Sequence, residues 1–242
     1  MRSTSRRHFE PFYRHFLFVS ALTGLTLSGC VGAKGANAGG ASEFDECAQG
    51  MIDDLEDGNG QILPLEERAG YWYTFADEDG TTIEPDGELV PAKGGAASSQ
   101  LAARIKGKTA DQRNVWAGMA FSLTNPKGTY DVSRYQGISF YARKSKGSTA
   151  VIVFRMPDGN TDPQGGVCKS CWNDFSAQLT LTDHWQKFVL PFSELKQEPG
   201  WGERHPEPAL DKVFELRWQI KTRNVDYDIW VDQIRFIGCP KK

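Results

Sequence analysis

The segment Glu215–Lys221 reads ELRWQIK, and every second residue between its charged ends is apolar. Successive side chains of a β-strand point to opposite faces of the sheet, so this alternation predicts a strand with one buried and one polar face. The buried face carries Leu216, Trp218 and Ile220. The polar face carries Glu215, Arg217, Gln219 and Lys221. One sheet therefore presents long hydrogen-bonding side chains, either to a ligand or to solvent.

Strand-like segments of this kind recur along the chain, separated by clusters of Gly, Pro, Asn and Asp. Within Ala150–Met156 the alternation places Arg155 on the face opposite the large apolar residues. No segment keeps a helical period over several turns, and short helical turns are predicted only at Val132–Tyr135 and Phe192–Leu195. Many short strands joined by turns predict an all-β fold, an antiparallel β-sandwich of jelly-roll type. The remaining predicted strands are Gly70–Phe75, Leu101–Ile105, Trp116–Leu123, Ile138–Arg143, Ala177–Leu181, Trp185–Pro191 and Tyr227–Ile237.

The N-terminus has the features of a bacterial lipoprotein signal. A basic start precedes the apolar stretch Phe16–Leu27, and the run LSGC that ends at Cys30 is a lipobox. We expect residues 1–29 to be a signal peptide and Cys30 to be lipidated, which anchors an exported protein to the cell envelope, at the outer membrane. The lipid is then the only membrane contact, because a spanning helix needs roughly 20 apolar residues. Residues 30–46 read as a flexible tether and residues 47–242 as one folded domain.

Four cysteines remain in the predicted domain: Cys47, Cys168, Cys171 and Cys239. An exported location favours disulfides, and four cysteines allow three connectivities. We favour a local bridge between Cys168 and Cys171. Cys47 and Cys239 would then join the two ends of the domain.

Asp232 is the unusual residue of the last predicted strand, because the period of two places its carboxylate on the apolar face. A buried carboxylate needs a hydrogen-bonding partner or a metal ion. If the ends of the domain are bridged, the acidic run 53–57 lies nearby. Asp54, Glu56 and Asp232, with backbone carbonyls, would then offer oxygen ligands for a structural calcium ion. The alternative is that Asp232 accepts hydrogen bonds from backbone amides and that the acidic run is a solvated loop.

The chain contains seven tryptophans, has a net charge of −3, and shows no basic stripe that would indicate a nucleic-acid partner. The aromatic residues that could stack on sugar rings are Tyr71, Trp72, Tyr73, Trp116, Trp172 and Trp201. Trp185, Trp218 and Trp230 lie in apolar alternation and are expected in the core. Trp201 lies in a predicted loop, where a large ring either packs back on the sandwich or serves a ligand. We expect a monomer.

No catalytic motif is present: the chain has neither a nucleophile elbow nor a Ser/His/Asp signature. A glycoside hydrolase would need two carboxylates facing each other across a cleft, roughly 5–9.5 Å apart. Carboxylates occur here at the density of any soluble domain, so we predict no enzymatic activity.

The chain from Met51 to Gly238 resembles the family 11 carbohydrate-binding module, one of the galactose-binding-like jelly rolls. The blocks that carry the resemblance are MIDDLE at Met51–Glu56, DVS at Asp131–Ser133, GISF at Gly137–Phe140, WQK at Trp185–Lys187, LPFS at Leu190–Ser193 and WVDQIRFIG at Trp230–Gly238. The resemblance implies a sheet that binds β-linked glucans and a structural calcium ion. The cysteine pair before Trp172 departs from the family pattern.

Carried over to this sequence, the resemblance places Tyr73 near a stacking tyrosine, Glu215 and Arg217 on the cleft face, and Trp201 in a loop that holds binding residues. Together with the strand faces, this predicts a set of ligand-binding residues: Tyr73, Trp116, Arg155, Trp201, Glu215, Arg217 and Gln219. We expect a non-catalytic polysaccharide-binding or oligosaccharide-binding lipoprotein. The alternatives are an envelope structural or assembly protein that holds a protein partner, and an accessory module of a polysaccharide-degrading, cellulase-type system.

Overall fold

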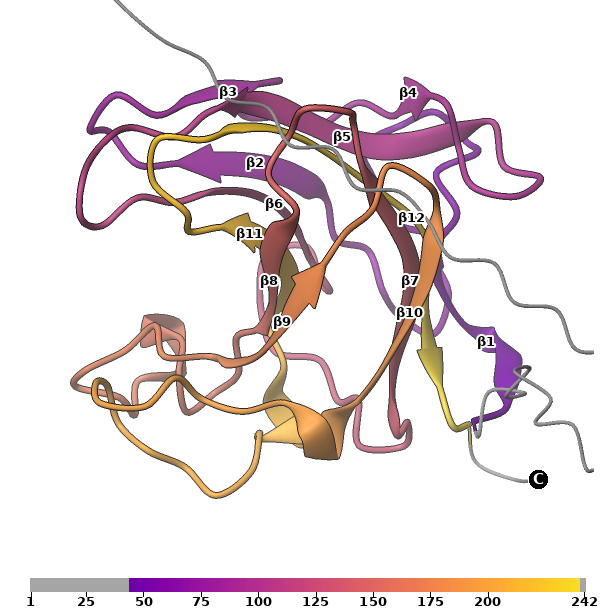
Figure 1. Ribbon diagram of the computed structural model, residues 1–242. Coiled ribbons are helices and arrows are strands. Elements are labelled where there is room, and N and C mark those ends of the chain that lie inside the picture. The colour runs from indigo at the N-terminus through magenta and orange to yellow at the C-terminus, as the bar shows by residue number, and fades with distance from the viewer. Residues whose placement is uncertain (1–43, 240–242) are drawn as a thin grey trace, which may run out of the picture. The chain divides into compact units, whose positions relative to one another are not determined.

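Two antiparallel sheets make up residues 44–239, the part of the chain that the computed structural model describes (Figure 1). The larger sheet contains β1 (Glu46–Asp53), β3 (Thr82–Glu84), β4 (Ala92–Lys93), β5 (Leu101–Lys108), β7 (Gly137–Lys144), β10 (Gln186–Pro191) and β12 (Asp226–Ile237). The smaller sheet contains β2 (Trp72–Ala76), β6 (Ala117–Ser122), β8 (Val151–Met156), β9 (Phe175–Thr180) and β11 (Glu215–Ile220). Their apolar faces enclose one core, which confirms the predicted jelly-roll sandwich.

The strand order sets which residues become neighbours. The larger sheet runs β10-β7-β12-β5-β3, with β1 added on β12 and β4 on β5, and the smaller sheet runs β2-β6-β11-β8-β9. Every predicted strand is present, with small shifts at the ends. The prediction lacks β1, whose sequence ECAQGMID does not alternate, and β3 and β4, which have only three and two residues.

Three short 3-10 helices complete the regular structure: η1 (Pro163–Gly165), η2 (Phe192–Glu194) and η3 (Leu210–Lys212). The helical turn predicted at Phe192–Leu195 corresponds to η2. The turn predicted at Val132–Tyr135 is present as a single turn, closed by a hydrogen bond of 2.9 Å from the N–H of Tyr135 to the carbonyl of Val132, and it does not extend into a helix.

Trp218 of β11 lies at the centre of the core and contacts aromatic rings from both sheets. Its ring lies 5.2 Å from Phe140 of β7, 5.6 Å from Phe154 of β8 and 5.7 Å from Trp72 of β2, measured between ring centroids. The side chain is 1% exposed. Leu216 and Ile220 are buried beside it, so the predicted inner face of Glu215–Lys221 is confirmed.

A buried carboxylate also links the two sheets. Asp53, at the end of β1, accepts a hydrogen bond of 2.7 Å from the indole N–H of Trp72 in β2, and one of 3.0 Å from the backbone N–H of Leu55. The side chain is fully buried. Burial raises the pKa of Asp53 to about 7, although both hydrogen bonds favour the ionised form.

The last strand contains a β-bulge that changes the predicted orientation of Asp232. Gln233 has a φ of 50°, and the register between β12 and β7 shifts between Asp232 and Arg235. A bulge adds one residue to one strand, so the side-chain alternation inverts across it. Asp232 and Trp230 therefore lie on the face away from the core.

The remaining core assignments follow from that inversion. Val231 before the bulge and Ile234 after it both belong to the core. Trp230 is buried, as expected, but it is not part of the core cluster: its ring is held between Arg104 and Arg143, at 4.4 and 4.2 Å, on the outer face of the larger sheet. Trp185 also lies outside the core and contacts Arg143 at 5.1 Å.

The two ends of the domain lie side by side. β1 pairs with β12, and a disulfide joins Cys47 to Cys239 with a Cα–Cα distance of 6.2 Å. The second disulfide joins Cys168 to Cys171, so the favoured connectivity is confirmed. The predicted signal peptide (1–29), Cys30 and most of the tether lie outside the described residues. Within residues 44–239, no helix is long and apolar enough to cross a membrane.

We predict that Trp218→Ala lowers the free energy of unfolding by about 3–5 kcal/mol, because it leaves a large cavity between the sheets. Denaturant unfolding measures the loss. The matched control is Trp201→Ala, which removes a ring that is 41% exposed and is expected to cost less than about 1 kcal/mol. Equal losses in the two variants would contradict this account of the core.

We also predict that stability depends on the protonation of Asp53. Its pKa in the folded state, about 7, lies above its ordinary value of 3.8, so the folded protein binds the proton more tightly than the unfolded chain. The contribution is therefore fully present below about pH 4 and is lost as the pH rises to about 7. Relative to Asp53→Asn, the unfolding free energy of the wild type should fall by about 2–4 kcal/mol between pH 4 and pH 8. A pH-independent difference would contradict the prediction.

Candidate functional site

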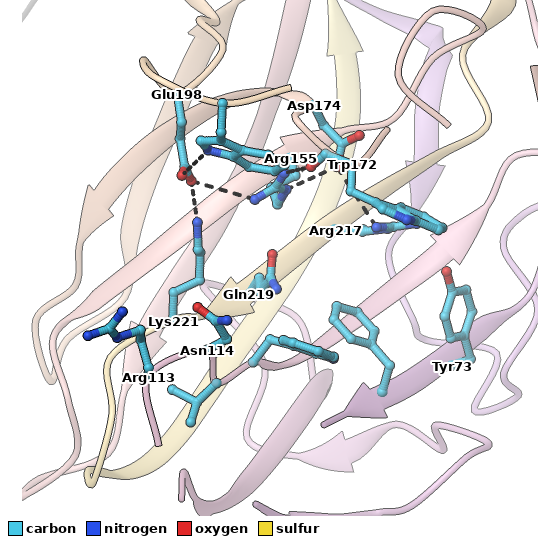
Figure 2. A pocket seen from close by; sticks show the side chains of 14 residues that line it. Tyr73, Arg113, Asn114, Arg155, Trp172, Asp174, Glu198, Arg217, Gln219 and Lys221 are labelled. Atoms are coloured by element: carbon cyan, nitrogen blue, oxygen red, sulfur yellow. Dashed lines mark hydrogen bonds and ion pairs between the residues drawn. The ribbon is translucent and has the colours of Figure 1, made fainter. Parts of the chain in front are cut away.

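A groove with a volume of about 880 Å³ lies on the outer face of the smaller sheet (Figure 2). The inner faces of β2, β8 and β11 are occupied by core residues, so the alternate side chains of these strands project into the groove. Three loops complete it: the β5–β6 loop, the β8–β9 loop and the loop after η2. The lining residues are Tyr73, Phe75, Arg113, Asn114, Val115, Trp116, Arg155, Trp172, Asp174, Glu198, Trp201, Arg217, Gln219 and Lys221.

The first row of side chains across the groove follows directly from strand register. Tyr73 of β2 is opposite Ala120 of β6, which is opposite Arg217 of β11, which in turn is opposite Arg155 of β8. The small side chain of Ala120 therefore lies between the larger side chains of β2 and β11.

The second row lies two residues further along each strand. Phe75 of β2, Gly118 of β6 and Gln219 of β11 are register partners. A Cβ atom at Gly118 would lie 2.5 Å from the ring of Phe75, so no larger residue fits there without moving that ring. Glycine at this position lets the ring of Phe75 lie against the strand backbone.

A buried carboxylate organises one end of the floor. Glu215 is fully buried, accepts a hydrogen bond from the hydroxyl of Tyr73, and forms an ion pair with Arg217. The ammonium of Lys127 lies 3.1 Å from the same carboxylate. Burial and the neighbouring Glu215 raise the pKa of Tyr73, so its hydroxyl remains a donor. Burial disfavours the charged form of Arg217, but the carboxylates of Glu215 and Asp174 outweigh this and raise its pKa.

Arg155 connects this end of the floor to the loops. Its Nε atom lies 3.0 Å from Asp174, its Nη1 atom lies 3.6 Å from Glu198, and its Nη2 atom donates to the carbonyl of Trp172 (Figure 2). Burial favours the protonated form of Glu198, but its hydrogen bond and ion pair with Lys221, together with Trp201 and Arg155, outweigh burial and lower its pKa. The guanidinium of Arg155 is thus held in place on all sides.

The charges of this network balance. It contains four cations, Lys127, Arg155, Arg217 and Lys221, and four anions, Asp162, Asp174, Glu198 and Glu215. Arg113, at the edge of the groove, is the one lining cation without an ion pair to the described residues (Figure 2). The floor therefore offers polar groups with little net charge.

Aromatic side chains enter the groove from both edges of the sheet. Tyr73 and Phe75 come from β2 and Trp116 from the β5–β6 loop just before β6, whereas Trp172 comes from the β8–β9 loop and Trp201 from the loop after η2. The three tryptophans are between 41% and 47% exposed. Large apolar surface left open in a polar groove indicates a binding site rather than a structural contact.

The structure brings together six of the seven predicted ligand-binding residues: Tyr73, Trp116, Arg155, Trp201, Arg217 and Gln219. Glu215 is a correction, because its carboxylate is fully buried at one end of the floor, where it contacts Tyr73 and Arg217 and does not line the groove. The loops leave Arg155 only 4% exposed. The predicted set of ligand-binding residues lacks Phe75 and Lys221, although they continue the alternation of Tyr73 and Gln219. No sequence pattern marks Arg113, Asp174 or Glu198.

The expected metal ligands do not form a cluster of three. Within residues 44–239, no group of three or more acidic, histidine or cysteine side chains could hold a metal ion. Glu56 accepts hydrogen bonds from the backbone amides of Gln100 and Leu101, and Asp232 accepts one from Ala96. The side chain of Asp54 caps a local turn instead. The predicted ligand set of Asp54, Glu56 and Asp232 is therefore wrong. Glu56 and Asp232 do contact the same loop, at residues 96–101. Calcium binding stays a prediction.

Comparisons with known proteins agree with this geometry. The family model for carbohydrate binding domain 30 matches residues 67–238. No curated protein matches the chain. The fold is similar to the family 11 carbohydrate-binding module from Clostridium thermocellum, solved in complex with a β-1,3-1,4-mixed-linked tetrasaccharide: the TM-score is 0.57 at 18% identity, over 80% of this chain and 97% of that one.

A second similar structure is the family 30 carbohydrate-binding module of a cellulosomal cellulase from Clostridium thermocellum. Its TM-score is 0.51 at 16% identity, over 71% of this chain and 92% of that one. At such identities the structures show a shared fold, which confirms the family 11 resemblance at that level. The family model covers most of the chain, from Glu67 to Gly238, and the chain therefore belongs to the carbohydrate binding domain 30 family.

Proposed function

We propose that the groove binds a segment of a neutral polysaccharide of the β-glucan type. The protein is a non-catalytic carbohydrate-binding module. The observation that supports this ligand is the convergence of three half-exposed tryptophans on a floor of hydrogen-bonding side chains. Aromatic rings cover the apolar faces of pyranose units, while arginine and glutamine side chains pair with hydroxyl groups.

The charge balance of the floor favours a neutral sugar chain over an acidic one. The network pairs four cations with four anions, so a carboxylated ligand would meet one unpaired cation only, Arg113. The same network holds Arg155 and Arg217 in place before a ligand arrives. Groups that are already ordered lose little conformational entropy on binding.

The cellular setting that we propose comes from the N-terminal sequence. A lipid on Cys30 and a tether would hold the domain, as a monomer, at the bacterial envelope, on the outer membrane. The groove would then retain polysaccharide at the cell surface. The two disulfides are consistent with an oxidising compartment.

We further propose that Glu56 and Asp232, with backbone carbonyls, hold a structural calcium ion. Both carboxylates contact the segment 96–101, and burial, together with the nearby Glu56 charge, raises the pKa of Asp232 to about 6. A cation would relieve this repulsion, and hard oxygen donors suit calcium.

We predict that Trp116→Ala and Trp201→Ala each weaken binding of a β-1,3-1,4-mixed-linked glucan tetrasaccharide by about tenfold or more, as expected for aromatic anchors that the bound sugar covers. Isothermal titration calorimetry measures the affinity. The matched control is Trp185→Ala, which removes a ring outside the groove and should leave the affinity unchanged. A wild-type protein that binds neither this probe nor any of a panel of neutral polysaccharides would overturn the proposed function.

We predict that calcium raises the melting temperature by about 5–10 °C relative to the protein in EDTA. Differential scanning calorimetry measures the shift. Asp232→Asn keeps the shape of the side chain but removes its charge, and it should abolish most of the response. An identical melting temperature with calcium and with EDTA would contradict the site.

A further inference from the structure

The loop between β8 and β9 contains a disulfide that is remote from the core. Cys47 and Cys239 pack against the core cluster, whereas Cys168 and Cys171 do not belong to it. The sequence separation is 192 residues for the first bridge and three for the second. Because the stabilisation by chain entropy grows with loop length, the short bridge contributes little to global stability. Its role is therefore local.

Trp172 directly follows this disulfide and has an unusual backbone. Its φ is 74°, in the left-handed region that large side chains rarely adopt. The backbone N–H of Trp172 donates to the carbonyl of Thr161 at 2.9 Å, and its carbonyl accepts from Arg155. In this conformation the ring lies over Arg217, with 5.4 Å between the guanidinium carbon and the ring centroid. Surrounding structure must hold such a residue in place.

The neighbouring segments connect Trp172 to the second tryptophan loop. Asn173 donates to the carbonyls of Glu198 at 2.9 Å and Trp201 at 2.7 Å. The carboxylate of Glu203 accepts from the backbone N–H of Lys169, inside the disulfide ring, at 2.7 Å. The disulfide ring is thus attached to the loop that carries Trp201.

We propose that the Cys168–Cys171 disulfide is a positioning element of the glycan groove, which holds Trp172 in the left-handed conformation that places its ring over Arg217. This role rests on the proposed glycan binding, because the placed ring is one wall of the groove. Without the bridge, the segment 168–171 gains conformational freedom, Trp172 relaxes to a negative φ, and its ring leaves the groove. A sugar must then reorder the loop in order to bind, which weakens affinity.

The test removes the bridge from the full chain by Cys168→Ser with Cys171→Ser. We expect the affinity for the β-1,3-1,4-mixed-linked tetrasaccharide to fall about tenfold, similar to the loss in Trp172→Ala. In the Trp172→Ala background, removing the bridge should cost less than about twofold, because a positioning element has no effect once its target is gone. Independent, multiplicative losses would overturn the proposal.

A ligand-free measurement separates this inference from the proposed function. The indole N–H resonance of Trp172, assigned with Trp172→Phe, should move toward its random-coil position when the bridge is removed, while the resonances of the five tryptophans outside the two coupled loops stay. If the wild type does not bind the probe but the Trp172 resonance moves, the proposed function fails and the positioning role stands. An unmoved Trp172 resonance overturns the inference, whatever the binding result.

Two further pairs of cysteine substitutions complete the experiment. Cys47→Ser with Cys239→Ser removes the bridge that packs against the core, and it should lower the melting temperature without changing the Trp172 resonance. Should the first serine pair not fold, Cys168→Ala with Cys171→Ala makes the same test with a smaller, apolar replacement.

Discussion

The packing of Trp218 between the two sheets is the contact on which both core and groove depend. Its ring meets aromatic side chains of β2, β7 and β8, and this fixes the height and rotation of β11 in the sandwich. Because side chains alternate along a strand, fixing Trp218 inward also fixes Arg217 and Gln219 outward. The core therefore determines where the floor of the groove lies.

The floor is built from charges that are largely removed from water. Glu215 is fully buried and Arg155 nearly so; Glu215 accepts from Tyr73 and pairs with Arg217, and Arg155 pairs with Asp174 and donates to the carbonyl of Trp172. A buried ion pair adds little net stability, but breaking one is costly, so such a network holds its members rigidly. Rigid donors suit the recognition of sugar hydroxyls, because hydrogen bonds to hydroxyl groups depend on the direction of the donor more than on net charge.

The walls of the groove have a different origin from its floor. Tyr73 and Phe75 belong to a strand, whereas Trp172 and Trp201 lie on loops that depend on one another through Asn173. Gly202, with a φ of 67°, packs against Asn173, where a Cβ atom would lie 2.6 Å from the asparagine Cβ. Loops over a rigid sheet can vary in sequence without disturbing the core. Family members can therefore differ in ligand through the sequences of these loops.

Local sequence by itself determined most of the strands, the inner and outer faces of those that alternate regularly, and the short cysteine bridge, because a period of two and a three-residue separation are properties of a single segment. It could not reveal the bulge at Gln233, which turns Asp232 away from the core. Nor could it show that Glu215 is covered while Arg217 remains partly open, or that Trp172 and Trp201 reach the same groove. Only the tertiary structure decided these points, since burial of an outer face and the meeting of distant loops depend on what packs over each strand rather than on the strand itself.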